Sequence, residues 1–365
     1  MSSIKAKDTN GIAVEIGFDG CIISSIEVAD AAEHLALPGF VDIHNHGAIG
    51  VDVNSASVED LLRTGEFLAT KGVTAWLPTL VPDSDDNYQR VTDSINNAMR
   101  LQVDKPIAQI VGVHYEGVFA NEAMCGALRP QYFRNGHWAM DGGQLPKLDH
   151  GVHMTTLAPE IDGGIEVIEQ LVADGWIVSI GHTKADTPTL ERAFAAGARH
   201  LTHFFNAMTP IHHRNIGVAG WGISREGVTF DIIADGIHVA PEMVRHACRS
   251  RGTDRVSIIS DSVAPTGLGD GDYELWDEKL AVINGRTQNE RGSIAGSVCT
   301  MADEIRLMHD LGFSVGEIAA MASTNPARLL GLDDRGSLEI GKRADYVLVD
   351  DEMKIIATYI GGRPV

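Results

Sequence analysis

Short apolar runs alternate along the chain with segments of helical periodicity. The runs are Val41–His46, Val73–Thr79, Ile107–Glu116, His153–Pro159, Trp176–His182, His200–Phe205, Thr229–Asp235 and Val256–Asp261. Helical segments separate several of them; in residues 57–72, for example, Val58, Leu61 and Leu68 fall on one face. Eight repeats of a strand followed by a helix predict an α/β protein with a closed parallel (β/α)8 TIM barrel.

Polar residues that can bind metals or carry protons close most of these runs. They are His44, His46, Glu116, His182, His203 and Asp261. The carboxyl ends of barrel strands form the active-site face. A single residue of this kind is more often a loop anchor, and Asp261 could also be the N-cap of a helix. Five strands that bring such residues to one rim predict a metal site instead.

His44 and His46 are separated by one residue at the end of the first run. Residues i and i+2 of a strand point to the same face, so both imidazoles can reach one point while Asn45 points away. Imidazoles together with a carboxylate suit Zn²⁺ or a similar divalent ion, whose open position holds a water of lowered pKa. Surface strands also carry such pairs by chance, so the pair alone leaves a structural role open.

Composition limits the class of protein. The chain has 365 residues, is 44% hydrophobic and carries a formal net charge of −21, which argues against nucleic acid or an anionic membrane as the main partner. The cysteines show no CxxC spacing, so we expect free thiols in a reducing compartment. No stretch approaches a signal peptide or the ~18 apolar residues of a membrane span, and we expect a cytoplasmic protein.

Several motifs carry a family resemblance. The segment PGFVDIHNHG (38–47) resembles the first-strand motif of the amidohydrolase superfamily. Within that superfamily the chain resembles N-acetylglucosamine-6-phosphate deacetylases, through GVHYEGVF, IGHTKAD, THFFNAMTPIHHR, ADGIHV, ISDSVAPTG and GSIAGS. The resemblance implies metal-dependent hydrolysis of the N-acetyl group of N-acetylglucosamine 6-phosphate, which gives glucosamine 6-phosphate and acetate.

The resemblance also implies a domain plan. The last segment, residues 336–365, resembles the β-rich tail that pairs with the N-terminal segment in this superfamily. Residues 1–38 and 334–365 would then form one small β-sandwich, and residues 39–333 the catalytic barrel. The family resemblance further implies a homodimer.

Site residues follow from the matching motif positions. The resemblance makes Glu116, His182 and His203 the ligands of the principal metal and Asp261 the catalytic acid and base. His44 and His46 match positions that hold a second ion in some members, so one or two ions are expected, with zinc as the expected metal. The positions expected to line the sugar and phosphate site are Ala127, Asn206, Ala207, Arg214, His238, Ile294, Ala295 and Gly296.

Arg214 is the most informative of these positions, because an acidic chain needs a local cation to bind a dianionic phosphate. In the family this arginine reaches the site of a neighbouring subunit. Without the resemblance, the sequence leaves a second possibility open, in which Arg214 is a solvent-exposed charged residue of a loop.

One loop departs from the family pattern. The usual HLEGPF reads HYEGVF, and the following KGAH reads CGALRP, so Leu128 replaces a substrate-contacting histidine. We expect Arg129 to offer a new donor there and the discrimination between gluco and galacto epimers to be weak. A deacetylase of N-acetylgalactosamine 6-phosphate is therefore an alternative function.

Three other functions fit parts of the pattern. A glycoside hydrolase could use Glu116 and Asp261, but it would not require four histidines at strand ends. An amidohydrolase that acts on a cyclic amide or imide would share the ligands but not need the FNAM and HHR loop. An inactive scaffold would have lost part of the ligand set, which is complete here.

Overall fold

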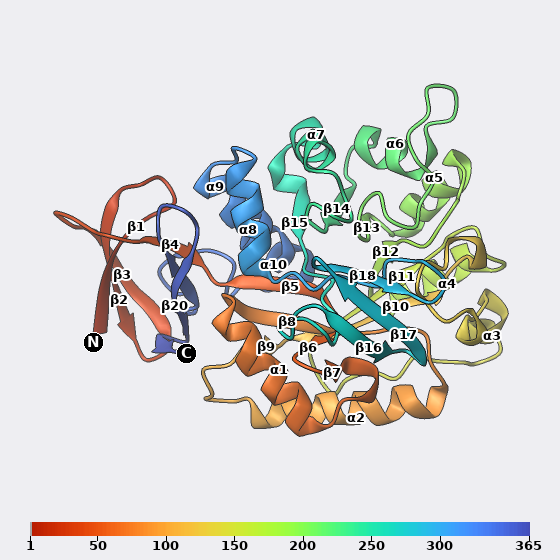
Figure 1. Ribbon diagram of the computed structural model, residues 1–365, viewed down its shortest axis with the longest axis horizontal. Helices are drawn as coiled ribbons and strands as arrows, with labels where there is room; N and C mark the ends of the chain where they lie inside the picture. The colour runs from red at the N-terminus through yellow and green to blue at the C-terminus, as the bar shows by residue number, and fades with distance from the viewer. Residues whose placement is uncertain (1) are drawn as a thin grey trace.

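The computed structural model describes residues 2–365 and consists of a barrel joined to a β-sheet built from both chain ends (Figure 1). The barrel strands are β5 (Phe40–Asn45), β8 (Val73–Leu80), β10 (Gly112–Phe119), β11 (Val152–Leu157), β12 (Ile177–Ile180), β13 (His200–Leu201), β14 (Thr229–Ile232) and β15 (Val256–Ile258). Each strand pairs in parallel with the next, and a parallel bridge between Asn45 and Ser262 joins the first strand to the last. The predicted (β/α)8 barrel is confirmed.

Each predicted apolar run overlaps a barrel strand, but the bounds differ: β8 and β10 continue past the ends of their runs, whereas several other strands end earlier than the runs. The run His200–Phe205 contains only the two-residue strand β13, and the run Ile107–Glu116 also contains the short strand β9 (Gln109–Ile110). His182, His203 and Asp261 have positive φ angles of 47°, 35° and 46°, which extended strands do not adopt. These polar residues therefore lie in the loops that follow the strands.

Helices follow most of the barrel strands and cover the outside of the barrel (Figure 1). They are α1 (Val58–Thr70), α2 (Asp85–Leu101), α3 (Gly136–Met140), α4 (Gly164–Ala173), α5 (Thr187–Ala196), α6 (Gly217–Ser224), α7 (Pro241–Arg251), α8 (Met301–Asp310), α9 (Val315–Ala319) and α10 (Asn325–Leu330). Ser57 starts α1 with a capping box, because its hydroxyl accepts from Asp60 N–H while the Asp60 carboxylate accepts from Ser57 N–H.

Strands from both termini form the second sheet, which supports the predicted small β-domain. Its strands are β1 (Ser2–Lys7), β2 (Ala13–Asp19), β3 (Ile22–Val28), β4 (Leu35–Pro38), β19 (Tyr346–Val349), β20 (Ile355–Ile360) and β21 (Arg363–Pro364). The two ends meet where β4 pairs antiparallel with β19, and Phe18 stacks on Tyr346 at a centroid distance of 5.4 Å. The boundaries at 38/39 and 333/334 stay a prediction, and Met1 lies outside the described residues.

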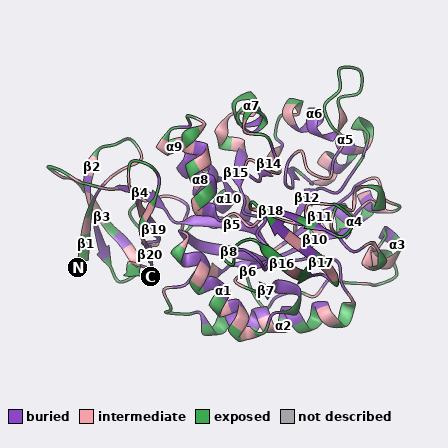
Figure 2. Cartoon of the chain, in the orientation of Figure 1, coloured by how far each residue is buried: buried purple, intermediate pink, exposed green. Residues whose placement is uncertain are grey.

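The barrel strands are buried along most of their length, as a parallel sheet covered by helices should be (Figure 2). All six residues of β5 are buried, including Asp42. The Asp42 carboxylate accepts hydrogen bonds from Ser260 Oγ at 2.6 Å and Asn45 Nδ2 at 3.0 Å. Burial raises the pKa of Asp42. This network holds the end of β5 against the segment after β15, where the site residues gather.

Three further strands lie across the barrel in Figure 1: β16 (Gly271–Leu275), β17 (Glu278–Ile283) and β18 (Arg286–Asn289). They form an antiparallel sheet in the segment between β15 and α8. Leu275, Trp276 and Leu280 from this sheet pack with Val81 and Leu128. The three-stranded sheet is therefore attached to the loops of the active-site face.

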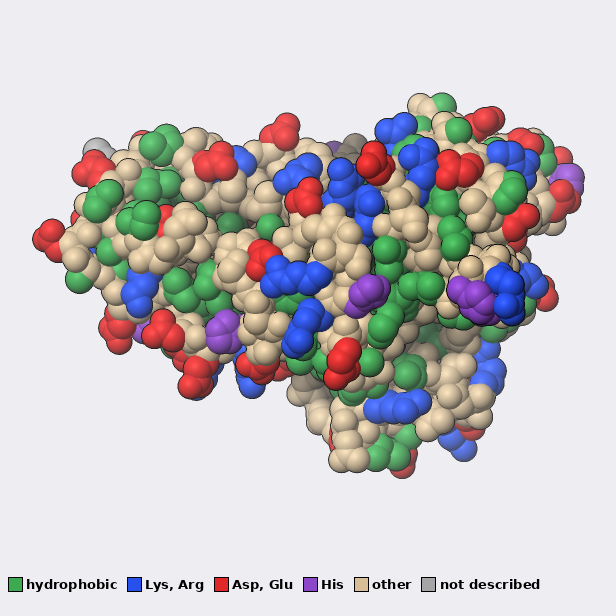
Figure 3. Space-filling model, turned by 90° about the horizontal axis from the view of Figure 1, so that it is seen from above, with side chains coloured by type: hydrophobic (Ala, Val, Ile, Leu, Met, Phe, Trp, Pro, Cys, Tyr) green, Lys and Arg blue, Asp and Glu red, His purple; other side chains and the backbone are tan. Residues whose placement is uncertain are grey.

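On the face shown in Figure 3, Lys and Arg side chains lie among Asp and Glu side chains. Within residues 2–365, no helix is long and apolar enough to cross a membrane.

Candidate metal centre and active site

Two groups of metal-ligating side chains meet at the centre of the barrel and share one carboxylate. His44, His46 and Glu116 form one group, and Glu116, His182 and His203 form the other; within each group the ligand atoms lie within 4.8 Å of one another. All five side chains are buried. The five residues lie on or just after four barrel strands, so the barrel topology brings together the donor set from which the sequence predicted a metal site.

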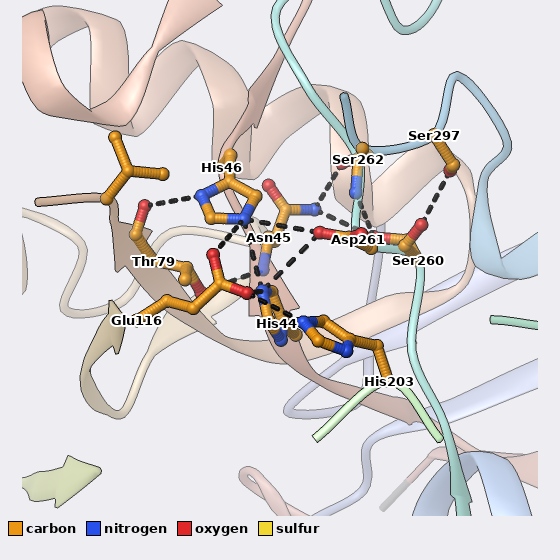
Figure 4. A network of polar contacts seen from close by, with 12 residues as sticks. His44, Asn45, His46, Thr79, Glu116, His203, Ser260, Asp261, Ser262 and Ser297 are labelled. Carbon is orange, nitrogen blue, oxygen red and sulfur yellow. Dashed lines mark hydrogen bonds and ion pairs between the residues drawn. The ribbon is translucent and has the colours of Figure 1, made fainter. Parts of the chain in front are cut away.

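Glu116 lies between the two histidine pairs. Its Oε1 atom is 3.1 Å from His182 Nε2, 3.0 Å from His203 Nε2 and 3.4 Å from His44 Nε2. Its Oε2 atom is 3.3 Å from His46 Nε2 (Figure 4). One carboxylate can therefore offer an oxygen to an ion on either side.

The outer nitrogens of two histidines determine which nitrogen is available to an ion. His46 Nδ1 lies 3.1 Å from Thr79 O, and His182 Nδ1 lies 2.7 Å from Met124 O. A carbonyl only accepts, so each Nδ1 carries a hydrogen and each Nε2 of the neutral ring presents a lone pair to Glu116. Facing a carboxylate in this way requires a cation between the two atoms, which is either a proton on Nε2 or a metal ion. The donor set therefore fits a metal ion.

Backbone conformation aims three of the polar side chains into the barrel. His182, His203 and Asp261 have left-handed backbones directly after their strands. Such conformations are uncommon outside glycine and cluster at functional sites. The amide of Asp261 donates to His44 O at 3.0 Å, which fixes this turn against β5.

The Asp261 carboxylate faces the first histidine pair. Its Oδ1 atom lies 3.2 Å from His46 Nε2 and 3.4 Å from His44 Nε2 (Figure 4). Burial raises the pKa of Asp261, but the two histidines outweigh burial and lower it below its usual value. Asp261 caps none of the described helices, so the N-cap alternative is wrong.

The charged groups of the site lie close enough to change one another's pKa. Burial raises the pKa of Glu116, but the surrounding histidines outweigh burial and hold it well below its usual range. Burial lowers the pKa of His46, but Asp261 and Glu116 outweigh burial and raise it to about 10. For His203 the same competition, with Glu116 as the main partner, raises the pKa to about 9. The carboxylates thus attract positive charge to the place where the Nε2 atoms meet.

A cavity of about 280 Å³ opens onto these side chains. Six of the predicted substrate positions line it, namely Ala127, Asn206, Ala207, His238, Ile294 and Gly296. His238 is held by Asp235, whose Oδ2 atom lies 2.6 Å from His238 Nδ1. The cavity is thus bordered by residues from several loops of the active-site face.

Two predicted substrate positions do not line this cavity. Ala295 is buried, and its amide donates to Thr287 Oγ1 at 3.1 Å. Arg214 is exposed in the long loop between β13 and α6 that projects from the barrel (Figure 1). Arg214 Nη1 lies 2.8 Å from His213 Nε2. Within this chain Arg214 is therefore separate from the cavity.

The expectation that Arg129 offers a free donor to the sugar is wrong. Arg129 is buried, and it donates to Asp83 Oδ2 at 2.6 Å, Asp277 Oδ2 at 3.1 Å and Pro82 O at 3.1 Å. A guanidinium engaged in this way ties loops together. The sequence did not reveal these partners, because Asp277 is 148 residues away.

Sequence reasoning also missed two residues at the site. Trp276 lines the cavity, and its ring meets the His46 ring edge-on at a centroid distance of 5.3 Å. Thr79 orients His46 through its backbone carbonyl. Thr79 ends an apolar run and could have been found by its position, whereas no sequence signal indicated that Trp276 reaches the site.

A sequence model of the amidohydrolase family matches residues 35–365. The chain belongs to the amidohydrolase family. It is 34% identical over 350 residues to an N-acetylglucosamine-6-phosphate deacetylase from Bacillus subtilis (strain 168), covering 93% of this chain and 86% of that protein. It is 33% identical over 340 residues to an N-acetylgalactosamine-6-phosphate deacetylase from Escherichia coli O157:H7, covering 93% of this chain and 89% of that protein.

Solved structures show the same likeness. The N-acetylglucosamine-6-phosphate deacetylase of Thermotoga maritima superposes with a TM-score of 0.91 at 28% identity, over 100% of this chain and 98% of the other. A mutant of the Mycobacterium smegmatis enzyme, in complex with N-acetyl-D-glucosamine-6-phosphate, gives a TM-score of 0.89 at 28% identity, over 100% and 99%. The family membership excludes the glycoside hydrolase reading of Glu116 and Asp261.

Proposed function

We propose that this amidohydrolase removes the N-acetyl group of N-acetylglucosamine 6-phosphate and releases glucosamine 6-phosphate and acetate. The observation that carries the proposal is the position of Asp261. Its carboxylate borders the cavity and lies within 3.4 Å of His44 and His46. These histidines belong to the metal-type cluster, which consists of His44, His46, Glu116, His182 and His203. Similarity to curated deacetylases along 93% of the chain supports the choice of substrate class.

Glu116, His182 and His203 would hold one divalent ion, and His44 and His46 with Glu116 would hold a second. We propose zinc, since imidazole and carboxylate ligands suit it. When bound, an ion in this site supplies Lewis acidity, which polarises an amide carbonyl and lowers the pKa of a water.

Asp261 is proposed to move the proton. It is a carboxylate at neutral pH and takes a proton from the water that attacks the amide carbonyl carbon. As the C–N bond breaks, Asp261 returns that proton to the departing nitrogen, because an unprotonated amide nitrogen is a very poor leaving group. The water oxygen ends in acetate, and the amine remains on the sugar.

The cavity residues are proposed to bind the sugar phosphate. His238, which Asp235 orients, and the loop residues Asn206 and Ala207 border the cavity on the side of β13 and β14. Ile294 and Gly296 are proposed to contribute through their backbone, while the buried Ala295 is proposed to hold them in place; Ala127 lines the cavity from the loop after β10.

We propose a cytoplasmic homodimer in which Arg214 binds the phosphate in the neighbouring subunit's cavity. Its exposed position on a projecting loop supports this role. In a dimer confirmed by sedimentation, Arg214→Ala should raise KM for the phosphorylated sugar and leave KM for N-acetylglucosamine unchanged. An unchanged KM for the phosphorylated sugar would contradict the role of Arg214.

The proposed activity is tested by a deacetylation screen over acetylated amino sugars with and without the 6-phosphate. N-acetylgalactosamine 6-phosphate belongs in the screen, because a deacetylase of that sugar is among the relatives. A cyclic imide is the negative control. The proposal expects the highest kcat/KM on N-acetylglucosamine 6-phosphate; hydrolysis of the cyclic imide alone would overturn it.

A further inference from the structure

The tip of the β16–β17 hairpin carries a large aromatic side chain into the cavity. Trp276 follows β16, lines the cavity and contacts the ring of His46, while the sheet around it lies across the barrel (Figure 1). Only 9% of Trp276 is exposed. An indole in this place reduces the space beside the first histidine pair.

The backbone at the tip is unusual for the residues it holds. Leu275 pairs with Glu278, so Trp276 and Asp277 form a two-residue turn, with φ angles of 53° and 66°. Turns that need two positive φ angles favour Asn and Gly, and a bulky residue there is disfavoured. Such strain persists only where surrounding contacts hold it, and it clusters at functional sites.

Contacts on both sides hold the turn in place. Asp277 accepts from Arg129 Nη1 at 3.1 Å, and Arg129 in turn donates to Asp83. Trp276 Nε1 donates to Asp52 Oδ1 at 3.4 Å. The indole is therefore fixed between the loop after β5 and the loop after β10.

Two of the proposed sugar contacts, Asn206 and His238, lie on a different side of the His44, His46, Glu116, His182 and His203 cluster from Trp276, whereas Ala127 and Ala295 pack near Trp276. Asn206 and His238 follow β13 and β14, whereas Trp276 lies beside His46, which follows β5. Consider a substrate whose amide carbonyl lies at this cluster and whose sugar lies toward β13 and β14. The acyl substituent of that amide then points the other way, toward β5.

We propose that Trp276 determines acyl specificity, a role that rests on the proposed deacetylase function. Its ring bounds the space that receives the methyl group of the acetyl substrate. An acyl chain longer by one or two methylenes collides with the indole and is excluded. Asp277 and Arg129 are positioning residues, because they fix the turn without touching the substrate.

The test compares N-acetyl-, N-propionyl- and N-butyrylglucosamine 6-phosphate as substrates of wild type, Trp276→Ala and Trp276→Phe. For wild type, kcat/KM should fall by roughly 100-fold from acetyl to butyryl, since each methylene in an apolar pocket is worth about tenfold or more. In Trp276→Ala the ratio should shrink to less than about tenfold, with Trp276→Phe between the two. Ile283→Ala is the matched control, because Ile283 is 63% exposed in the same hairpin.

Circular dichroism and elemental analysis establish that each variant is folded and metal-loaded, and Trp276→Phe serves if the alanine variant does not fold. An unchanged acetyl-to-butyryl ratio in a folded Trp276 variant overturns this inference and leaves the deacetylase proposal standing. Absence of acetyl hydrolysis by wild type overturns the deacetylase proposal and this inference with it. A ratio that changes equally in Ile283→Ala also overturns the inference.

Discussion

His44 Nε2 lies 3.1 Å from His46 Nε2 in the buried centre of the barrel. Thr79 O accepts a hydrogen from His46 Nδ1, so Nε2 is the nitrogen of His46 that is left to bind an ion. The pair is therefore arranged so that it could supply two ligands to one ion, and Glu116 belongs both to this group and to the group of His182 and His203 that could hold another.

Histidine substitutions should change the number of ions bound. We expect wild type dialysed against excess Zn²⁺ to hold two ions per chain, and His44→Asn and His46→Asn each to hold about one fewer. His238→Asn is the control, since His238 lines the cavity outside both ligand groups. Elemental analysis measures the zinc content of each protein. If wild type holds one ion and both variants retain it, His44 and His46 have a structural role and do not bind metal.

Asp261→Asn should separate catalysis from metal binding. The amide side chain keeps the shape of Asp261 but cannot take up the proton from water. We expect kcat to fall by a factor on the order of 10² or more, while metal content stays near wild type. Steady-state kinetics and elemental analysis of the same preparation check this, and retained turnover would exclude Asp261 as the acid and base.

The eight apolar runs and their polar ends could be predicted because buried parallel strands are apolar along their length and end at one rim. The HxH spacing and the family motifs indicated which of those ends hold the metal-type residues. Trp276 and Arg129 could not be placed, because their positions depend on a strained turn and on ion pairs between segments far apart in the chain. Local patterns report local geometry, whereas these contacts depend on the completed fold.

Leu128 should make epimer discrimination weak. Its side chain is buried beside the cavity and offers no hydrogen bond, and Arg129 is occupied by other partners. We expect kcat/KM for the gluco and galacto 6-phosphates to differ by less than about tenfold. Leu128→His should widen that difference by about 1 to 3 kcal/mol. Leu128→Ala is the control, because it removes the leucine packing without adding a hydrogen-bond donor. If both variants change the discrimination between the epimers equally, the prediction is contradicted.

The Asp83–Arg129 pair should give stability that depends on pH. Burial raises the pKa of Asp83, but hydrogen bonds from Asn54, Ser84 and Arg129 outweigh burial and lower it. The carboxylate therefore stabilises the fold above the ordinary pKa of about 3.9, and this stabilisation is lost as the pH falls through the lower pKa of the folded state.

Asp83→Asn should cost about 1 to 3 kcal/mol of unfolding free energy at pH 7, and its difference from wild type should shrink below about pH 4. Asp277→Asn is the comparison, since that carboxylate is 81% exposed and should cost less than about 1 kcal/mol. Urea unfolding between about pH 3 and 7 measures both variants. A difference for Asp83→Asn that is constant over this range would contradict the role of its charge.

The central claim is that this chain hydrolyses N-acetylglucosamine 6-phosphate and needs a metal in the histidine and carboxylate cluster to do so. The most direct measurement is acetate and free amine released from this substrate by one preparation before chelation, after chelation and after addition of Zn²⁺. The account predicts equal amounts of both products, loss of activity on chelation and its return with the metal. Full activity in protein shown by elemental analysis to be metal-free, or no release of acetate by metal-loaded protein, would contradict it.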